Sequence, residues 1–347
     1  MRVRTASLIL AAVLFTATVG LLRAADPMYV KLAEIPIGGA GAFDYLNVDS
    51  AAKRLYVTHG TEVVVIDVTT NAIVGRITDT PGVHGIAFAP GGRGFTSNGR
   101  ENKVSIVDLK TLQTLMKVET GANPDAILFE PKQKEIYALN HTGKSATVID
   151  AASGKVVTTI PLAGEAESGQ ADPALNRVFV NIEDKNSVDV IDITTHTVVA
   201  NWPVAPAEEP TGMAIDLEKH LLFVGGGPNT VMIDAKTGKV VASAPICGGT
   251  DATWFDAEAK LVFSSCRDGH IAVMKEEGSK LTAVQSIPTV FGARTMALDP
   301  KTHRLYTASQ KFPAPDSNAP PPEPARGRGR GPAAIPDSFH VLVFEMR

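Results

Sequence analysis

An apolar, β-branched run that ends in aspartate occurs five times along this chain at nearly constant spacing. The five aspartates are Asp67, Asp108, Asp150, Asp192 and Asp234, and the intervals between them are 41, 42, 42 and 42 residues. A period of this length is typical of one supersecondary unit repeated in tandem. A carboxylate at the end of a strand can accept the backbone amides of the next turn, so we expect structural roles for these aspartates rather than catalytic ones.

Each period contains four short segments rich in Val, Ile, Phe and Thr, separated by Gly, Pro, Asn and Asp. This pattern is typical of β-strands and turns. A four-stranded meander of this size leaves apolar side chains on both faces and must stack on copies of itself. The sequence therefore predicts an all-β fold, a seven-bladed β-propeller of four-stranded antiparallel blades. The predicted innermost strands are Asp44 to Val48, Ile86 to Ala89, Ala126 to Phe129, Gln170 to Asp172, Met213 to Asp216, Thr253 to Asp256 and Met296 to Asp299.

The two ends of the propeller are predicted to meet in the last blade. The seventh repeat contains only three candidate strands, whereas an additional apolar run, Tyr29 to Pro36, precedes the first blade. We expect this N-terminal strand to complete the seventh blade beside His340 to Phe344. Such closure would leave no unpaired inner edge.

Residues 1–25 have the pattern of a secretory signal peptide. Arg2 and Arg4 precede an apolar stretch, and the small residues Ala24 and Ala25 follow it. A retained single-pass anchor is the alternative, but the apolar stretch is short for a membrane span. We therefore expect cleavage, a propeller over residues 26–347, a periplasmic or secreted location, and no stable membrane anchor.

The charge balance is moderately acidic. Of the 347 residues, 44% are hydrophobic and 20% are charged, and the net charge is −4. Removal of the predicted signal would take away three arginines and leave a net charge of −7. An acidic balance argues against a general nucleic-acid binder.

Both cysteines, Cys247 and Cys266, fall in the sixth repeat. They are predicted to lie just before the first strand and at the end of the second strand of that blade, which are neighbouring positions in an antiparallel hairpin. An exported compartment permits a disulfide between them. Two buried, unpaired thiols are the alternative.

Residues 312–338 form a low-complexity insertion that contains eight of the 23 prolines and three Arg-Gly pairs. Its composition cannot bury a core, so we expect a disordered or polyproline-like excursion within blade seven. Arg-Gly repeats can bind RNA or acidic surfaces. A solvated spacer is the favoured interpretation, because the run is short and contains no interleaved aromatic residue.

The sequence resembles the YVTN-repeat family of exported seven-bladed propellers, which includes the YncE-like bacterial proteins. The motif is clearest at Leu55-Tyr56-Val57-Thr58, with weaker copies at Ile136 to Leu139, Val178 to Asn181, Leu222 to Gly225 and Leu305 to Ala308. The resemblance implies the fold and export from the cytoplasm, and it specifies no reaction. Some relatives are described as binding single-stranded DNA, and related propellers include lactonases and a lyase with sites over the central channel.

The loops at one end of the predicted channel carry most of the polar residues that are available for a site. The ligand-binding candidates are Asp44, His59, His84, Asp125, His141, Thr211, Asp251 and Arg294, and Asn98, Gln170, Glu183 and Arg267 are expected at the same end. Carboxylates and imidazoles can act as metal ligands or as acid–base groups. The same side chains can instead satisfy loop amides and line a water-filled channel. Because their spacing follows the blade period, we favour the second interpretation and predict no metal, cofactor or catalytic residue.

These observations favour an exported, monomeric binding or scaffold protein that recognises a ligand or protein partner at the channel mouth without catalysis. No nucleophile elbow and no paired-cysteine zinc motif occur in the sequence. The first alternative is a lactonase-like hydrolase or lyase with its site over the channel. The second is single-stranded nucleic-acid binding.

Overall fold

The computed structural model describes residues 28–39, 41–313 and 334–347. The predicted signal peptide, residues 1–25, and residues 314–333 of the predicted insertion lie outside the described residues. Within the described part of the chain, no helix has the length and apolar composition needed to cross a membrane.

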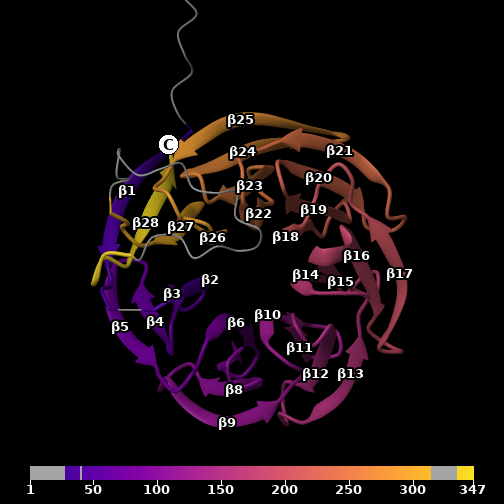
Figure 1. Cartoon of the computed structure of the whole chain (residues 1–347), viewed down its shortest axis with the longest axis horizontal. Helices are drawn as coiled ribbons and strands as arrows, with labels where there is room; N and C mark the ends of the chain where they lie inside the picture. Colours follow the sequence, from indigo (N-terminus) through magenta and orange to yellow (C-terminus); the bar gives the residue numbers. More distant parts are fainter. Residues whose placement is uncertain (1–27, 40, 314–333) are drawn as a thin grey trace, which may run out of the picture.

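The described chain forms seven four-stranded antiparallel sheets arranged as blades around a central axis (Figure 1). The prediction of an all-β, seven-bladed propeller is therefore confirmed. In each blade the strands follow one another outward from the axis. The innermost strands are β2 (Phe43–Asp49), β6 (Val83–Ala89), β10 (Pro124–Glu130), β14 (Ala166–Asp172), β18 (Pro210–Asp216), β22 (Thr250–Asp256) and β26 (Met296–Asp299).

The outer strands follow in chain order in blades one to six, and the N-terminal strand is the outermost strand of blade seven. The second strands are β3 (Arg54–His59), β7 (Arg93–Asn98), β11 (Glu135–Asn140), β15 (Arg177–Ile182), β19 (Leu221–Gly226), β23 (Leu261–Cys266) and β27 (Arg304–Ser309). The third strands are β4 (Glu62–Asp67), β8 (Lys103–Asp108), β12 (Ser145–Asp150), β16 (Ser187–Asp192), β20 (Asn229–Asp234), β24 (His270–Glu277) and β28 (His340–Met346). The outermost strands are β5 (Ala72–Ile77), β9 (Gln113–Glu119), β13 (Val156–Pro161), β17 (Thr197–Pro203), β21 (Val240–Pro245), β25 (Lys280–Pro288) and β1 (Tyr29–Pro36), and a short 3₁₀ turn, η1 (Glu183–Lys185), precedes β16.

The N-terminal strand closes the ring as predicted. β1 pairs antiparallel with β28, in a register that runs from Tyr29 opposite Met346 to Pro36 opposite His340. Blade seven therefore has the order β1-β28-β27-β26 and contains both ends of the propeller. Figure 1 shows β1 and β28 side by side at the rim.

An aromatic side chain in the second strand of every blade fills the space between neighbouring blades. Each is the third residue of its strand, and each is fully buried. The seven residues are Tyr56, Phe95, Tyr137, Phe179, Phe223, Phe263 and Tyr306. The tyrosine of the YVTN motif is thus one member of a larger set, in which tyrosine and phenylalanine provide the apolar area that holds the stacked sheets together.

The repeated aspartates cap turns at the rim of the blades. Asp67 Oδ1 accepts the amides of Thr69 at 2.8 Å and Thr70 at 2.9 Å, and these bonds hold the pKa of Asp67 below its usual value. The other four repeated aspartates each accept at least one amide of the following turn in the same way. The predicted structural role is therefore confirmed.

Two histidines join neighbouring blades at the far end of the innermost strands. His220 Nδ1 lies 2.6 Å from Asp172 Oδ2, which links blade five to blade four. His303 Nδ1 lies 2.6 Å from Asp256 Oδ2, which links blade seven to blade six. The hydrogen bond to Asp256 raises the pKa of His303 above its ordinary value of 6.5, although burial opposes the shift.

We predict that the stability contributed by His303 falls as the pH rises. Because its folded-state pKa is raised, the contribution is fully present below the unfolded pKa and is lost as the pH passes through the folded pKa. Urea denaturation of the wild type and of His303→Gln should therefore differ more at about pH 5.5 than at about pH 9. Equal differences at the two pH values would contradict the ionic contact.

Candidate functional site

One position, at the start of the innermost strand in six blades and two residues before β26 in blade seven, forms a ring at the mouth of the channel. It lies five residues before the residue that ends the strand, so all seven blades present it at the same height. The ring residues are Asp44, His84, Asp125, Glu167, Thr211, Asp251 and Arg294. They line a cavity of about 400 Å³ together with the loop residues Glu183, Glu209 and Arg267.

The ring contains Glu167 where the sequence analysis placed Gln170. The predicted innermost strand of blade four, Gln170 to Asp172, was too short, because β14 begins at Ala166. Gln170 lies deeper in the channel, where its Nε2 donates to the carbonyl of Met213 at 3.0 Å. Counting back five residues from Asp172, as from the acidic residue that ends five of the other innermost strands, would have found Glu167.

Four neighbouring blades place carboxylates and imidazoles next to one another on one side of the mouth. We call this set the anionic arc: Asp44, His84, Asp125, His141 and Glu167. His84 Nδ1 donates to Asp44 Oδ2 at 2.7 Å and lies 3.6 Å from Asp125 Oδ1. His141, from the loop after β11, places its Nδ1 3.2 Å from Glu167 Oε1. Asp125 and Glu167 are only 9% and 6% exposed.

Burial and mutual contact shift the pKa of most groups in the arc. Burial would lower the pKa of His84, but the hydrogen bond to Asp44 and the charge of Asp125 outweigh it and raise the pKa to about 9. The hydrogen bond to Glu167 raises the pKa of His141 to about 9. Burial raises the pKa of Asp125 to about 6 and that of Glu167 to about 8, against the opposing charges of the histidines. Shifts of this size, clustered in a cavity, are typical of functional sites.

The two arginines of the mouth are held by groups of the propeller itself. Arg294 Nη2 donates to the carbonyl of Phe43 at 2.6 Å, and the guanidinium lies 5.3 Å from the Phe43 ring centroid. Arg294 Nε is 3.2 Å from Asp251 Oδ2, and Arg267 Nη2 is 3.4 Å from the same oxygen. Asp251 therefore pairs with both arginines. Burial would lower the pKa of Arg294, but nearby charges, including those of Asp44 and Asp125, raise it, so the charge of Arg294 also acts on the anionic arc.

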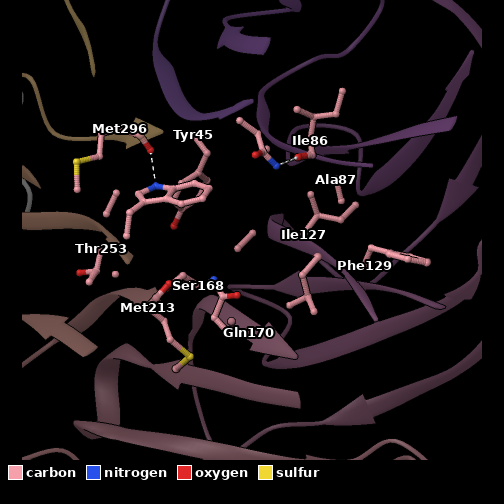
Figure 2. Close-up of a pocket in the computed structure, with 18 of the residues that line it drawn as sticks. Tyr45, Ile86, Ala87, Ile127, Phe129, Ser168, Gln170, Met213, Thr253 and Met296 are labelled. Atoms are coloured by element: carbon pink, nitrogen blue, oxygen red, sulfur yellow. Dashed lines mark hydrogen bonds between the residues drawn. The ribbon is translucent and has the colours of Figure 1, made fainter. Parts of the chain in front are cut away.

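Tyr45 lies between the mouth and a second cavity deeper in the channel, because it lines both. Its hydroxyl group donates to Glu167 Oε2 at 3.4 Å, which connects blade one to blade four. The deeper cavity, also of about 400 Å³, is lined by apolar side chains such as Ile127, Phe129 and Met213 (Figure 2). The channel thus has an ionisable mouth above a more apolar interior.

Not all candidates face the cavity. His59 is 3% exposed and stacks on Phe339, with ring centroids 4.2 Å apart, so the structure does not bring it into the ring. Thr211 does line the cavity, but its hydroxyl donates to the carbonyl of Thr250 at 2.7 Å. Asn98 is buried and donates to Ser105 Oγ at 2.8 Å.

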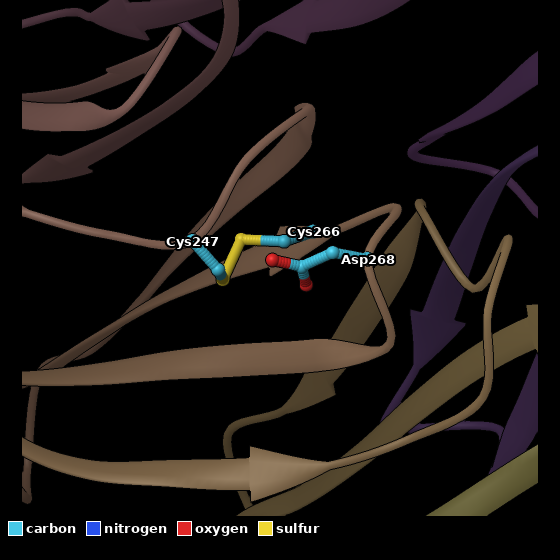
Figure 3. Close-up of side chains that lie close together, drawn as sticks. All are labelled: Cys247, Cys266 and Asp268. Carbon is cyan, nitrogen blue, oxygen red and sulfur yellow. A yellow bond between two sulfur atoms is a disulfide. The ribbon is translucent and has the colours of Figure 1, made fainter. Parts of the chain in front are cut away.

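Cys247 and Cys266 form a disulfide, with Cα atoms 5.7 Å apart (Figure 3). The bond ties the segment after β21 to the end of β23. The carboxylate of Asp268 lies close to the two sulfur atoms. Because both sulfurs are joined to each other, this group does not offer thiolate ligands to a metal.

Part of the chain is similar to curated proteins that are themselves described as uncharacterised. No protein-family model matches it. The uncharacterised protein YncE of Salmonella typhimurium (strain LT2) is 28% identical over 149 residues, and that of Salmonella typhi is 27% identical over 149 residues. Each match covers 41% of this chain and 42% of the relative, so the chain spans about two fifths of the length of these curated relatives.

Solved structures share the fold at low sequence identity. A chain of Kuenenia stuttgartiensis hydrazine synthase superposes with a TM-score of 0.69 at 18% identity, covering 80% of this chain and 94% of that chain. A chain of the mitotic checkpoint complex also gives a TM-score of 0.69, at 15% identity, covering 88% of this chain and 96% of that chain. At these identities the likeness establishes the propeller fold and nothing about activity.

Proposed function

Because this chain is a YncE-like seven-bladed β-propeller, we propose that it is an exported binding protein that captures a positively charged ligand at the channel mouth. The observation that carries the proposal is the anionic arc. Its carboxylates converge on one cavity from strands of different blades, and the two arginines of the mouth form their ion pairs with Asp251. A cavity with a few convergent polar groups is the default binding site of such a fold.

Charge and size narrow the ligand to a small cation or to a cationic group of a larger partner. The carboxylates of Asp125 and Glu167 are more than nine-tenths buried, and each already faces a histidine of the arc. A cationic ligand would give them a further positive partner. A cavity of about 400 Å³ accommodates a small molecule or a single side chain. The same charge disfavours phosphate groups, so single-stranded nucleic acid is not the ligand that we propose for this face.

A thermal-shift panel tests the proposal with the full chain. Putrescine, choline and lysine amide serve as cations, and glutarate and glucose as anionic and neutral controls. The cations should raise Tm, with a stabilisation of about 2.7 kcal/mol when a ligand is present at about 100 times its Kd. The shift should be lost in Asp125→Asn and Glu167→Gln, each measured against its own ligand-free Tm.

Glu218→Gln is the matched control, because Glu218 is an acidic side chain that is 80% exposed in the turn after β18. It should keep the full response to the cations. A shift that persists in both arc variants, or a response to glutarate alone, would contradict a cationic site at the mouth.

A hydrolase or lyase is the second candidate, and one contact favours it. Asp44 holds His84 by a 2.7 Å hydrogen bond, an arrangement that can orient an imidazole for proton transfer. Turnover of a lactone or a cyclic peptide that disappears in His84→Gln would establish this activity. It would also overturn the proposal of binding without catalysis.

A further inference from the structure

The anionic arc contains two groups of potential metal ligands that share one residue. The ligand atoms of Asp44, His84 and Asp125 all lie within 4.8 Å of one another, and so do those of Asp125, His141 and Glu167. Asp125 belongs to both groups. The five side chains come from blades one to four, at or next to the ends of strands whose backbone positions are fixed by the sheets.

Several of the separations already approach those of a coordination shell. Protein nitrogens and oxygens bind Zn²⁺ at about 2.0–2.2 Å, so neighbouring ligand atoms of one ion lie about 3–4 Å apart. The His84 Nδ1 to Asp125 Oδ1 distance is 3.6 Å, and the His141 Nδ1 to Glu167 Oε1 distance is 3.2 Å. In the group formed by Asp125, His141 and Glu167, all three ligand atoms lie within 4.8 Å of one another, so this group already approaches the spacing of a coordination shell.

The chemistry of the donors distinguishes among cations. An organic ammonium group can donate hydrogen bonds to the carboxylates. A metal ion can in addition be coordinated by the lone pair of an imidazole nitrogen. An imidazole in the set favours a transition metal, since Ca²⁺ and Mg²⁺ prefer an all-oxygen shell. The arc also lies beside a cavity that leaves room for water or a ligand atom on the open side of the ion.

We propose that the anionic arc binds one divalent transition-metal ion of the Zn²⁺ type, with Asp125, His141 and Glu167 as its ligands. This inference rests on the proposed function, since the ion is one member of the class of cations that the mouth would capture. Asp44 and His84, joined by a hydrogen bond from His84 Nδ1 to Asp44 Oδ2, form the neighbouring group that shares Asp125 with this site.

Calorimetric titration of chelator-treated full-length protein tests the site, with Zn²⁺ as the probe and Ca²⁺ and Mg²⁺ as competitors. We expect about one Zn²⁺ per chain and binding that an excess of Ca²⁺ or Mg²⁺ does not displace. Asp125→Asn and His141→Gln should each weaken Zn²⁺ binding at least about tenfold, whereas Glu218→Gln should bind like the wild type. Co²⁺ provides an independent readout, because its visible absorption changes on coordination by imidazole and carboxylate.

Weaker binding could also result from an unfolded variant. Two arc variants are therefore used, and circular dichroism of each establishes that it is folded. Binding of Zn²⁺ that is unchanged in both variants, or equal affinity for Ca²⁺, would overturn the metal site. If Zn²⁺ fails to bind while putrescine or choline still stabilises the wild type but not Asp125→Asn, the metal inference is wrong and the proposed function stands. If neither kind of cation binds, both are wrong.

Discussion

Replacing Tyr29 with alanine is expected to cost about 3–5 kcal/mol of folding free energy, the range for removing a large aromatic side chain from a core. Tyr29 is 2% exposed, and its ring packs edge-on against Phe263 of blade six at 5.3 Å between centroids. Its hydroxyl group donates to the carbonyl of His303 at 2.9 Å. The substitution would leave a cavity where the closing strand meets the next blade, and it would leave that carbonyl without its donor.

The effect should be specific to the buried face of β1. Leu32, three residues along the same strand, is 40% exposed and lies where the register with β28 is interrupted. Leu32→Ala should therefore cost less than about 1 kcal/mol. Urea denaturation of the full chain gives both values, and equal losses for the two variants would show that the closing strand does not contribute through its buried side chain.

Loss of the disulfide should cost about 3 kcal/mol, the loop-entropy value for a loop of about this length. The bond spans a sequence separation of 19 residues. Because the chain has only two cysteines, a reductant can act on no other disulfide within it. Dithiothreitol should lower the stability of the wild type, and the double variant Cys247→Ser, Cys266→Ala should be less stable without it.

The double variant also supplies the control for the reductant. Adding dithiothreitol to it should change nothing, since it contains no cysteine. Any further loss of stability in that sample would mean that the reductant acts by another route. An unchanged wild type under full reduction, with both thiols alkylated after unfolding, would contradict a stabilising role for the bond.

The blade architecture could be predicted because it depends on short-range pattern. Apolar segments that alternate with turn residues at a fixed period define four-stranded sheets. These sheets can bury their apolar faces only by packing against neighbouring copies. The closing strand was predictable for the same reason, because Tyr29 to Pro36 has the pattern of a strand and blade seven lacked one. None of these inferences required knowledge of how one blade is rotated against the next.

The site was harder to predict, because it depends on contacts between blades. The start of β14 contains Ala166, Glu167, Ser168 and Gly169, without any β-branched residue, so local preference did not reveal the strand that carries Glu167. The contact between His141 and Glu167 arises only when blades three and four are packed together. His59 is expected at the mouth because it ends a strand on that side of the propeller. Its side chain instead stacks on the buried ring of Phe339.

Every blade contributes one side chain to the mouth from the same strand position, and that position is separate from the aromatic residues that hold the blades together. The mouth is therefore lined by seven positions whose side chains can vary while the aromatic residues between the blades stay the same. The aromatic core between the blades lies outside this ring, although some ring side chains, such as Arg294 and Thr211, also bond to the backbone of a neighbouring blade. Related chains with this architecture can diverge in what they recognise through a handful of substitutions, and engineered versions can be given new specificities by the same route.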